Sequence, residues 1–230
     1  MNPLDARERV RAYLLASAEV KQRAAETCPG EIARAAELMA ASLRAGGKIL
    51  LCGNGGSAAD CQHIAAKLVS VLRRDFVRPP LAAIALTTDT SFLTANANDF
   101  GFAGVFARQV EALGRPGDVL IGISTSGRSL NVVRAVACAK ERQLRTVVLT
   151  GEGGGELADL GEVVIRVPSG DVQHIQESHI AIGHVLCALV EGALFGVPGG
   201  ADGTRLRPRP PPPAPARATG QAGAPGSGQQ

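Results

Sequence analysis

The sequence predicts an α/β fold, a three-layer doubly wound arrangement in which about five parallel strands are covered by helices on both faces. Short apolar segments alternate with helical patterns between residues 48 and 195, and this alternation is typical of right-handed βαβ units. Two of the apolar segments run into loops rich in Gly, Ser and Thr, the first loop at residues 51–57 and the second loop at residues 122–129. Because ligands of such sheets lie beyond the carboxyl ends of the strands, both loops are expected at the binding site.

The chain begins with two predicted helices over residues 4–45, separated at Cys28-Pro29-Gly30. The second helix runs from about Glu31 to Ala45 and ends at Gly46-Gly47, a common helix stop. Strands are then expected near residues 48–52, 82–86, 118–123, 145–149 and 163–167. Helices are expected between them near residues 57–72, 91–97, 102–113, 128–142 and 155–160, and a long last helix at about residues 172–195.

Residues 1–196 are assigned to one domain because the composition changes abruptly after Gly196. Eight of the fourteen prolines lie from Pro198 onward, mixed with Gly, Ala, Gln and Arg. Such a segment cannot bury a core, so residues 197–230 are predicted to be a disordered Pro/Gly/Arg tail, partly in polyproline II. We favour an extension without a role over a ligand for a domain that reads PxxP or an anionic surface.

Charge and composition disfavour several classes of protein. The net charge of +3 comes from four arginines and one aspartate after residue 200, so the predicted domain is neutral. A neutral domain with 3% aromatic residues and no Trp does not predict a nucleic-acid partner. No apolar run is judged long enough to span a bilayer and the N-terminus shows no signal peptide, which predicts a cytoplasmic protein without a membrane partner. The five cysteines form no CxxC pair and are expected to be reduced and mostly buried.

The two loops have the chemistry of a phosphate site. Glycines allow close backbone approach, hydroxyls donate to oxygens, and the helix N-terminus that follows favours an anion. A Walker loop is excluded because no Lys follows the glycines at the required place. A dinucleotide fingerprint, Gly53-x-Gly55-x-x-Ala58, would need an acidic residue that closes the second strand, and Asp75 lies instead in a charged turn.

The four histidines form a second group of candidate residues. His63 lies on the helix after the first loop, and His174, His179 and His184 lie on the last helix, where Glu177 shares a face with His184. Histidine and carboxylate ligands suit zinc or a similar divalent ion. From spacing alone, a metal site and ordinary structural histidines are about equally favoured.

A third group of polar residues follows the second predicted strand. The segment Asn98-Asp99-Phe100-Gly101 could hydrogen-bond a ligand hydroxyl or form a turn. For Asp89 and Thr90, just upstream, we favour a role at a helix N-terminus.

Four ordered motifs make the chain resemble the sugar isomerase (SIS) family, and within it the bacterial phosphoheptose isomerases. They are CGNGGSAADCQHIAA, AIALTTDTSFLTANANDFGF, GDVLIGISTSGRSLNV and HIQESHIAIGHVLC, and with their spacing the resemblance covers residues 5–196. It implies the SIS fold and a homotetramer with active sites at subunit interfaces. It also implies conversion of sedoheptulose 7-phosphate into D-glycero-D-manno-heptose 7-phosphate, the first step toward nucleotide-activated (ADP- or GDP-) heptose, and one zinc ion per subunit.

The resemblance also implies roles for individual residues. Substrate contacts fall on Asn54, Gly55, Gly56, Asn98, Asp99, Ser124, Thr125, Ser126, Ser129 and Gln176. The four hydroxyl residues of the second loop would hold the phosphate group. Three of the family's four zinc-ligand positions fall on His63, Gln176 and His184, and His184 would also serve as an acid/base.

The fourth zinc position departs from the family pattern. The family carries a Glu there, which is both a ligand and the proposed catalytic base, whereas this chain carries Lys67. At about 4 Å and an effective dielectric of about 20, each unit of metal charge would repel the ammonium by about 4 kcal/mol. Lys67 would therefore be neutral, or swing away, or zinc would be absent; Asp60 or Glu177 is a candidate for a substitute carboxylate. A milder departure is Arg128, where the family usually has Asn and where a guanidinium would strengthen phosphate binding.

Three functional hypotheses follow. We favour a working phosphoheptose isomerase with a rearranged base. The alternatives are a weakened or inactive paralogue that still binds sugar phosphate in a mixed tetramer, and a non-catalytic module like the SIS proteins that associate with the replication initiator and lack the catalytic Glu. The loss of Glu at position 67 favours the alternatives, whereas the presence of His184 and Asn98-Asp99 favours the isomerase.

Overall fold

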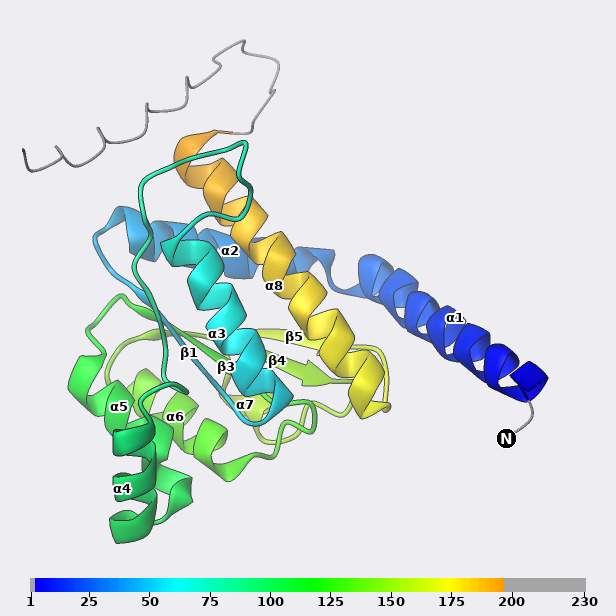
Figure 1. Ribbon diagram of the computed structural model, residues 1–230. Helices are drawn as coiled ribbons and strands as arrows, with labels where there is room; N and C mark the ends of the chain where they lie inside the picture. Colours follow the sequence, from blue (N-terminus) through cyan, green and yellow to red (C-terminus); the bar gives the residue numbers. More distant parts are fainter. Residues whose placement is uncertain (1–2, 197–230) are drawn as a thin grey trace, which may run out of the picture.

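The computed structural model describes residues 3–196, which build one parallel five-stranded sheet (Figure 1). The strands lie in the order β2-β1-β3-β4-β5, and every neighbouring pair is parallel. Their bounds are β1 Ile49–Gly53, β2 Ala83–Ala85, β3 Val119–Ile123, β4 Arg145–Gly151 and β5 Val163–Val167. The chain leaves β1 and β3, which are neighbours, toward opposite sides of the sheet, so the ends of these two strands form the ligand crevice expected for this strand order.

Helices cover both faces of the sheet. One face carries α2 (Pro29–Arg44), α3 (Gly56–Val69) and α8 (Val172–Phe195). The other carries α5 (Val105–Leu113), α6 (Leu130–Glu141) and the short α7 (Leu157–Leu160). The helix α4 (Thr90–Phe100) and a 3-10 turn, η1 (Phe102–Gly104), connect β2 to α5. This is the predicted three-layer doubly wound architecture.

The core is divided in two by the sheet because successive strand residues point to opposite faces. In β1, Ile49 and Leu51 pack toward α2, α3 and α8, whereas Leu50 and Cys52 pack toward α5 and α6. All four side chains are fully buried. Burial on both faces explains why the strands appear in the sequence as continuous apolar runs rather than as alternating patterns.

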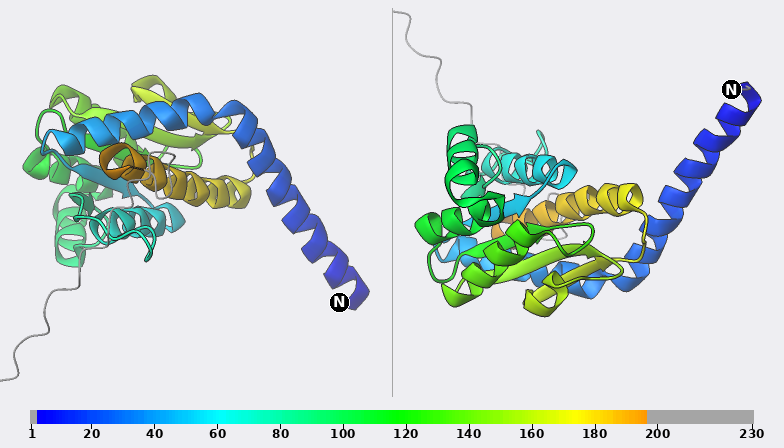
Figure 2. Two further views of the ribbon diagram at one scale, coloured as in Figure 1. Left: turned by 90° about the horizontal axis from the view of Figure 1, so that it is seen from above. Right: turned by 90° about the horizontal axis from the view of Figure 1, so that it is seen from below.

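The first helix, α1 (Pro3–Thr27), projects from the body of the molecule (Figures 1 and 2). Its second half is anchored, with Val20 and Ala24 in the core. Its first half carries exposed apolar side chains, with Val10, Leu14 and Leu15 each 59–61% exposed. Exposed apolar side chains gathered on a projecting helix are typical of an interaction surface.

The predicted elements are confirmed, with differences at their ends. The break between the first two helices is narrower than predicted, because only Cys28 interrupts them and Pro29 begins α2. Proline suits the first helical position, where its missing N–H would have no partner in any case. The predicted helix 102–113 begins with the 3-10 turn η1, and β4 extends to Gly151, two residues beyond the prediction. The predicted tail at 197–230 lies outside the described residues.

Two smaller expectations are also confirmed. The cysteines are free, with Cys138 partly buried and the other four buried. Asp89 caps α4, since its Oδ1 accepts a hydrogen bond from the Phe92 amide at 2.9 Å.

The expectation that no segment is long enough to cross a membrane needs correction. Within residues 3–196, α8 is one helix with sufficient length and apolar character. However, α8 packs against α1, α2 and α3, and it carries Glu191 in a buried ion pair with Arg78. Its apolar side chains, such as Leu186, lie in the core, so α8 is the central helix of one layer.

Candidate functional site

The first and second loops lie side by side at the carboxyl ends of β1 and β3. Gly53 pairs with Ile123 in the parallel register, so the two loops leave the sheet together. Gly55 has φ of 55° and Gly127 has φ of 66°, in the left-handed region that glycine adopts without strain. At Gly127 a Cβ would lie 1.9 Å from the Gly154 carbonyl oxygen, so the second loop also packs against the loop after β4.

A pair of asparagines joins the first loop to α6. The Asn54 amide donates to Asn131 Oδ1 at 2.9 Å, and the Asn131 amide donates back to Asn54 Oδ1 at 2.8 Å. Asn131 is buried, and its Oδ1 also accepts from the Val132 amide. Asn131 was not among the site residues predicted from the sequence. Its position, as a polar residue on the buried face of a helix just after the second loop, could have indicated a role at the site.

The hydroxyl groups of the second loop gather at the N-terminus of α6. Ser124 Oγ and Ser129 Oγ are 2.9 Å apart, and Ser126 Oγ accepts a hydrogen bond from the Arg128 amide at 3.2 Å. Thr125 lies between them and is partly buried. Ser129, the N-cap residue of α6, makes no side-chain capping bond, so hydroxyls and helix amides together provide donors for an anion.

The Gln176 side chain lies against the first loop. A Cβ on Gly56 would be 1.6 Å from Gln176 Nε2, so only glycine leaves room for this amide. Gln176 is eight residues before His184, which corresponds to about 12 Å along the axis of α8. The structure therefore brings Gln176 to the predicted substrate loop, and its expected role as a zinc ligand stays a prediction.

His63 of α3 and His184 of α8 face each other across the two helices. Their Nε2 atoms are 2.8 Å apart and their rings meet edge to face, with centroids 5.0 Å apart. Burial lowers the pKa of His63, and the neighbouring charges of His184 and Lys67 lower it further. The predicted proximity of the first-loop helix and the last helix is thus confirmed at these two side chains.

Lys67 lies close to this histidine pair. It is partly buried and follows His63 by four residues on α3, which places both on one face of the helix. Its charge acts on His63 and also on Cys187 of α8, one turn beyond His184. The Lys67 backbone is fixed as well, because Arg78 Nη2 donates to its carbonyl oxygen at 2.8 Å.

The structure does not place Glu177 as a substitute for the missing carboxylate. Glu177 binds α1 instead, where it accepts hydrogen bonds from Tyr13, Ser17 and Lys21. The Ser17 and Tyr13 hydroxyls, followed by the Lys21 ammonium, lower the pKa of Glu177 to about 2. Its charge is therefore engaged in anchoring the projecting helix.

Asp60 is not placed at the histidine pair either. It is 8% exposed, its Oδ2 has no hydrogen-bond partner within residues 3–196, and burial raises its pKa to about 6. The neighbouring charges that lower the pKa of His63 are those of His184 and Lys67. The sequence spacing predicts that Asp60 lies near the helix face that carries His63. However, a separation of three residues leaves the two side chains about 60° apart around the helix axis.

The remaining histidines have structural surroundings. His179 is fully buried, and its Nε2 lies 3.1 Å from the Thr150 carbonyl oxygen. Burial lowers the pKa of His179 to about 4, so it is neutral at physiological pH. The His174 ring packs against Tyr13 of α1, with centroids 4.7 Å apart. Only two of the four histidines therefore meet.

Asn98 and Asp99 lie on the exposed helix α4, where the Asn98 amide donates to Asp99 Oδ1 at 2.9 Å. Within residues 3–196, no hydrogen bond connects either residue to the two loops. Asp75, which the dinucleotide reading required, lies in an exposed turn and pairs with Arg73.

The donor set does not fit a zinc site of the usual kind. Structural and catalytic zinc sites use at least three protein ligands, commonly His, Cys, Asp or Glu. Within residues 3–196, no three such side chains come together in an arrangement that could hold a metal ion.

Known proteins resemble this chain over most of its length. The SIS domain family matches residues 12–151. A phosphoheptose isomerase of Roseiflexus sp. is 55% identical over 180 residues, covering 78% of this chain and 90% of that protein. One of Rhodospirillum rubrum is 51% identical over 187 residues, covering 81% of this chain and 98% of that protein. A solved phosphoheptose isomerase from Neisseria gonorrhoeae is 47% identical, with a TM-score of 0.77, and the match covers 81% of this chain and 99% of that one.

Proposed function

The chain belongs to the SIS-domain family and, within it, to the phosphoheptose isomerases, and from this membership we propose how its residues carry out the reaction. It is an aldose–ketose isomerase that converts sedoheptulose 7-phosphate into D-glycero-D-manno-heptose 7-phosphate. This product is the entry to nucleotide-activated heptose.

The observation that carries the proposal is the arrangement of loops and histidines along α3. Gly56, in the first loop, and His63 are seven residues apart, or about 10 Å along the helix axis. This separation is of the order of the length of an extended heptose phosphate. The phosphate group binds at the second loop, and the chain of hydroxylated carbons extends past Gly56 toward His63 and His184.

The second loop supplies the phosphate site. The Ser126 and Ser129 hydroxyls lie 3.4 Å and 2.9 Å from the Ser124 hydroxyl at the N-terminus of α6. Thr125 adds a fourth hydroxyl, and the exposed Arg128 adds a guanidinium that pairs well with phosphate oxygens. Binding energy from this remote group holds the carbonyl end in position for reaction.

The histidine pair supplies the acid/base chemistry. His184 accepts a proton from C1 of the ketose, the C1–H electron pair forms the C1–C2 double bond, and the C2 carbonyl oxygen becomes an oxyanion. The proton then returns to C2, while the C1 hydroxyl proton passes to the oxygen on C2. His63, hydrogen-bonded to His184, relays or holds the proton between these steps. The reaction needs no oxidant or reductant.

The remaining sugar-binding residues act at the two ends of this path. Asn54 and Gly55 contact the sugar at the first loop, with Asn131 holding Asn54 in place. Asn98 and Asp99 lie on α4, which is exposed in the single chain and is therefore accessible to a neighbouring subunit. In the assembled oligomer these two residues bind sugar hydroxyls. Zinc, which the family resemblance implies, stays a prediction.

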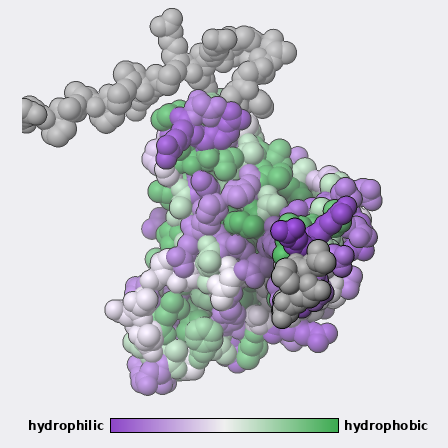
Figure 3. Space-filling model, turned by 45° about the vertical axis from the view of Figure 1, so that its right-hand side comes forward, coloured by the Kyte–Doolittle hydropathy of each residue, from purple (hydrophilic) through white to green (hydrophobic). Residues whose placement is uncertain are grey.

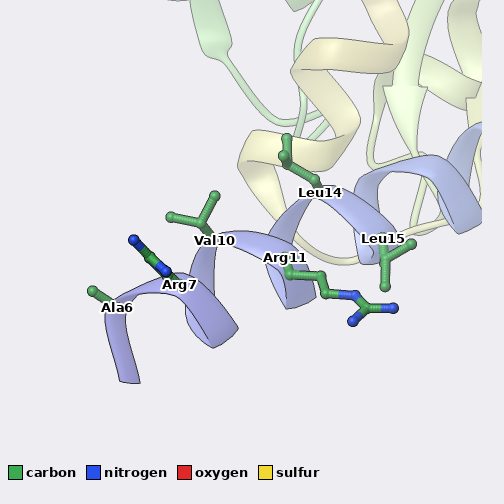
Figure 4. A pocket seen from close by; sticks show the side chains of 6 residues that line it. All are labelled: Ala6, Arg7, Val10, Arg11, Leu14 and Leu15. Atoms are coloured by element: carbon green, nitrogen blue, oxygen red, sulfur yellow. The ribbon is translucent and has the colours of Figure 1, made fainter. Parts of the chain in front are cut away.

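We propose a homotetramer assembled in part through α1. Six residues of the projecting half of α1 line an apolar groove of about 500 Å³, and Figure 4 shows Val10 and Leu14 on the same side of the helix. A second apolar groove, of about 480 Å³, lies between α1, α2 and α8 and includes the half-exposed Val185 and Leu189. Figure 3, in which the right-hand side of Figure 1 is turned forward, shows hydrophobic patches on the surface. One chain thus carries both a projecting apolar helix and an apolar groove. This combination suits the association of identical copies.

A charge introduced on α1 tests the assembly. Leu14→Glu places a carboxylate in the proposed interface, and light scattering after gel filtration should show smaller species than the wild-type tetramer. Val77→Glu, at another exposed valine, is the control and should remain tetrameric. A wild-type monomer, or an unchanged tetramer in Leu14→Glu, contradicts the proposal. The cytoplasm stays the expected location of the enzyme.

An NMR assay of sedoheptulose 7-phosphate isomerisation tests the proposed reaction. The wild-type chain should form the aldose, and unphosphorylated sedoheptulose should react far more slowly because it lacks the anchoring group. Ser124→Ala combined with Ser129→Ala should raise KM for the phosphorylated substrate. A protein that binds the sugar phosphate but never forms the aldose would instead be the non-catalytic member considered above.

A further inference from the structure

Lys67 has an unpaired positive charge next to the histidine pair. Its side chain is partly buried between α3 and α8, where its charge acts on His63 and Cys187. Across residues 3–196, no carboxylate lies within salt-bridge distance of its Nζ. A partly buried ammonium of this kind is well placed to stabilise an anion.

The carboxylates that could neutralise this charge are engaged elsewhere. Glu191, on the same helix as Cys187, binds the buried guanidinium of Arg78 at 2.8 Å. Glu177 anchors α1 through three side chains. Within residues 3–196, Asp60 forms no salt bridge with Lys67, and no carboxylate of this described part of the chain serves as its counter-ion.

The site beside His63 and His184 is poorly suited to a divalent metal ion. The donor set lacks the anionic ligand that a divalent ion would need, and the ammonium of Lys67 repels a cation placed beside His63 and His184. A positive charge is nevertheless required here, because isomerisation through an enediol places negative charge on the oxygen at C2. Lys67 can supply that charge.

We infer that Lys67 takes the place of a metal ion, and that its ammonium stabilises the oxyanion formed on C2 of the substrate. The inference rests on the proposed isomerase function. When the C1 proton leaves, the C2 carbonyl electron pair moves onto oxygen, and Lys67 Nζ donates a hydrogen bond to it. The oxyanion is discharged when the oxygen takes the C1 hydroxyl proton. Because this interaction is strongest in the transition state, it raises kcat more than it lowers KM.

The test compares full-length wild-type protein with three variants at position 67. Lys67→Met keeps the length of the side chain without its charge, Lys67→Arg keeps the charge, and Lys67→Glu restores the carboxylate of the family. Lys140→Met, at an exposed lysine at the end of α6, is the matched control. Each protein is assayed with sedoheptulose 7-phosphate in EDTA and in zinc, and its metal content is measured.

The inference predicts wild-type turnover that persists in EDTA. Lys67→Met should lose about 100-fold in kcat, the scale for removal of one oxyanion-stabilising donor, with little change in KM. Lys67→Arg should retain part of the activity, and Lys67→Glu should bind zinc and be active only with it. Wild-type activity that EDTA abolishes and zinc restores would overturn the inference, as would an unchanged kcat in Lys67→Met.

A binding measurement separates this inference from the proposed function. A phosphorylated sugar hydroxamate, an anionic analogue of the enediolate, serves as the probe in calorimetry without turnover. Wild-type protein should bind it at least 10-fold more tightly than Lys67→Met, while both bind substrate with similar affinity. Equal affinities for the probe would refute the role of Lys67 even in an active enzyme. A missing turnover with unequal affinities would refute the proposed reaction and with it the catalytic role of Lys67, while showing that Lys67 binds the anionic probe.

Discussion

Removal of one charge from the buried Arg78–Glu191 pair should strongly destabilise the fold. The side chains are 1% and 5% exposed, and Arg78 Nε and Nη2 lie 2.9 and 2.8 Å from Glu191 Oε1. The same guanidinium donates to the Lys67 and Leu68 carbonyl oxygens at the end of α3. The pair thus ties α3 to α8 at the end of the helices that carry the histidines.

Glu191→Gln keeps the shape and an acceptor oxygen but leaves the Arg78 charge uncompensated. Breaking a buried pair in this way costs about 3–5 kcal/mol. For a chain of this size, that corresponds to a fall in Tm on the order of 10 °C. The measurement is denaturant and thermal unfolding at one fixed subunit concentration, because association also contributes to stability.

The control is an exposed ion pair in the same protein. Arg108 and Glu111 are 67% and 48% exposed, so Glu111→Gln should cost less than about 1 kcal/mol. The double variant Arg78→Met/Glu191→Leu should cost less than the sum of its single variants, because it leaves no buried charge. A cost below about 1 kcal/mol for Glu191→Gln, or additive single variants, would refute the reasoning.

Two further predictions concern the substrate loop and a buried histidine. Gly56→Ala should weaken sugar-phosphate binding in calorimetry because its Cβ would displace the Gln176 amide, whereas Gly30→Ala, with open space around it, should bind normally; equal affinities would contradict the proposed contact. His179 has a pKa of about 4 in the fold against 6.5 when free, so the unfolded chain binds more protons between these values and stability falls as the pH is lowered from about 6.5 to about 4. His179→Gln should flatten this dependence in urea unfolding, and an unchanged slope would show that His179 is not its source.

Much of the fold follows from local sequence patterns. Strand 163–167 and the last helix 172–195 agree with the structure at both ends, because apolar runs, glycines and caps are local signals. Motif resemblance also identified both loops and the pair His63 and His184. The positions of these loops and histidines in the fold depend on strand order and helix placement, and the βαβ pattern constrains both.

The contacts that the sequence did not reveal depend on segments far apart in the chain. The bond between Asn54 and Asn131 spans 77 residues, and the bond from Tyr13 to Glu177 spans 164. No local pattern specifies such partners, so Glu177 was considered for the active site although it anchors α1. Whether Asp60 replaces the family carboxylate stays a prediction, since the spacing predicts a helix face only approximately.

The most direct test of the account is isomerisation of sedoheptulose 7-phosphate in D₂O, followed by NMR. The enediol path predicts that the wild-type protein forms the heptose with deuterium at C2 and returns ketose with deuterium at C1. If no aldose forms and the hydrogens on C1 of the recovered ketose remain unexchanged, the protein does not perform the reaction that its loops and histidines support.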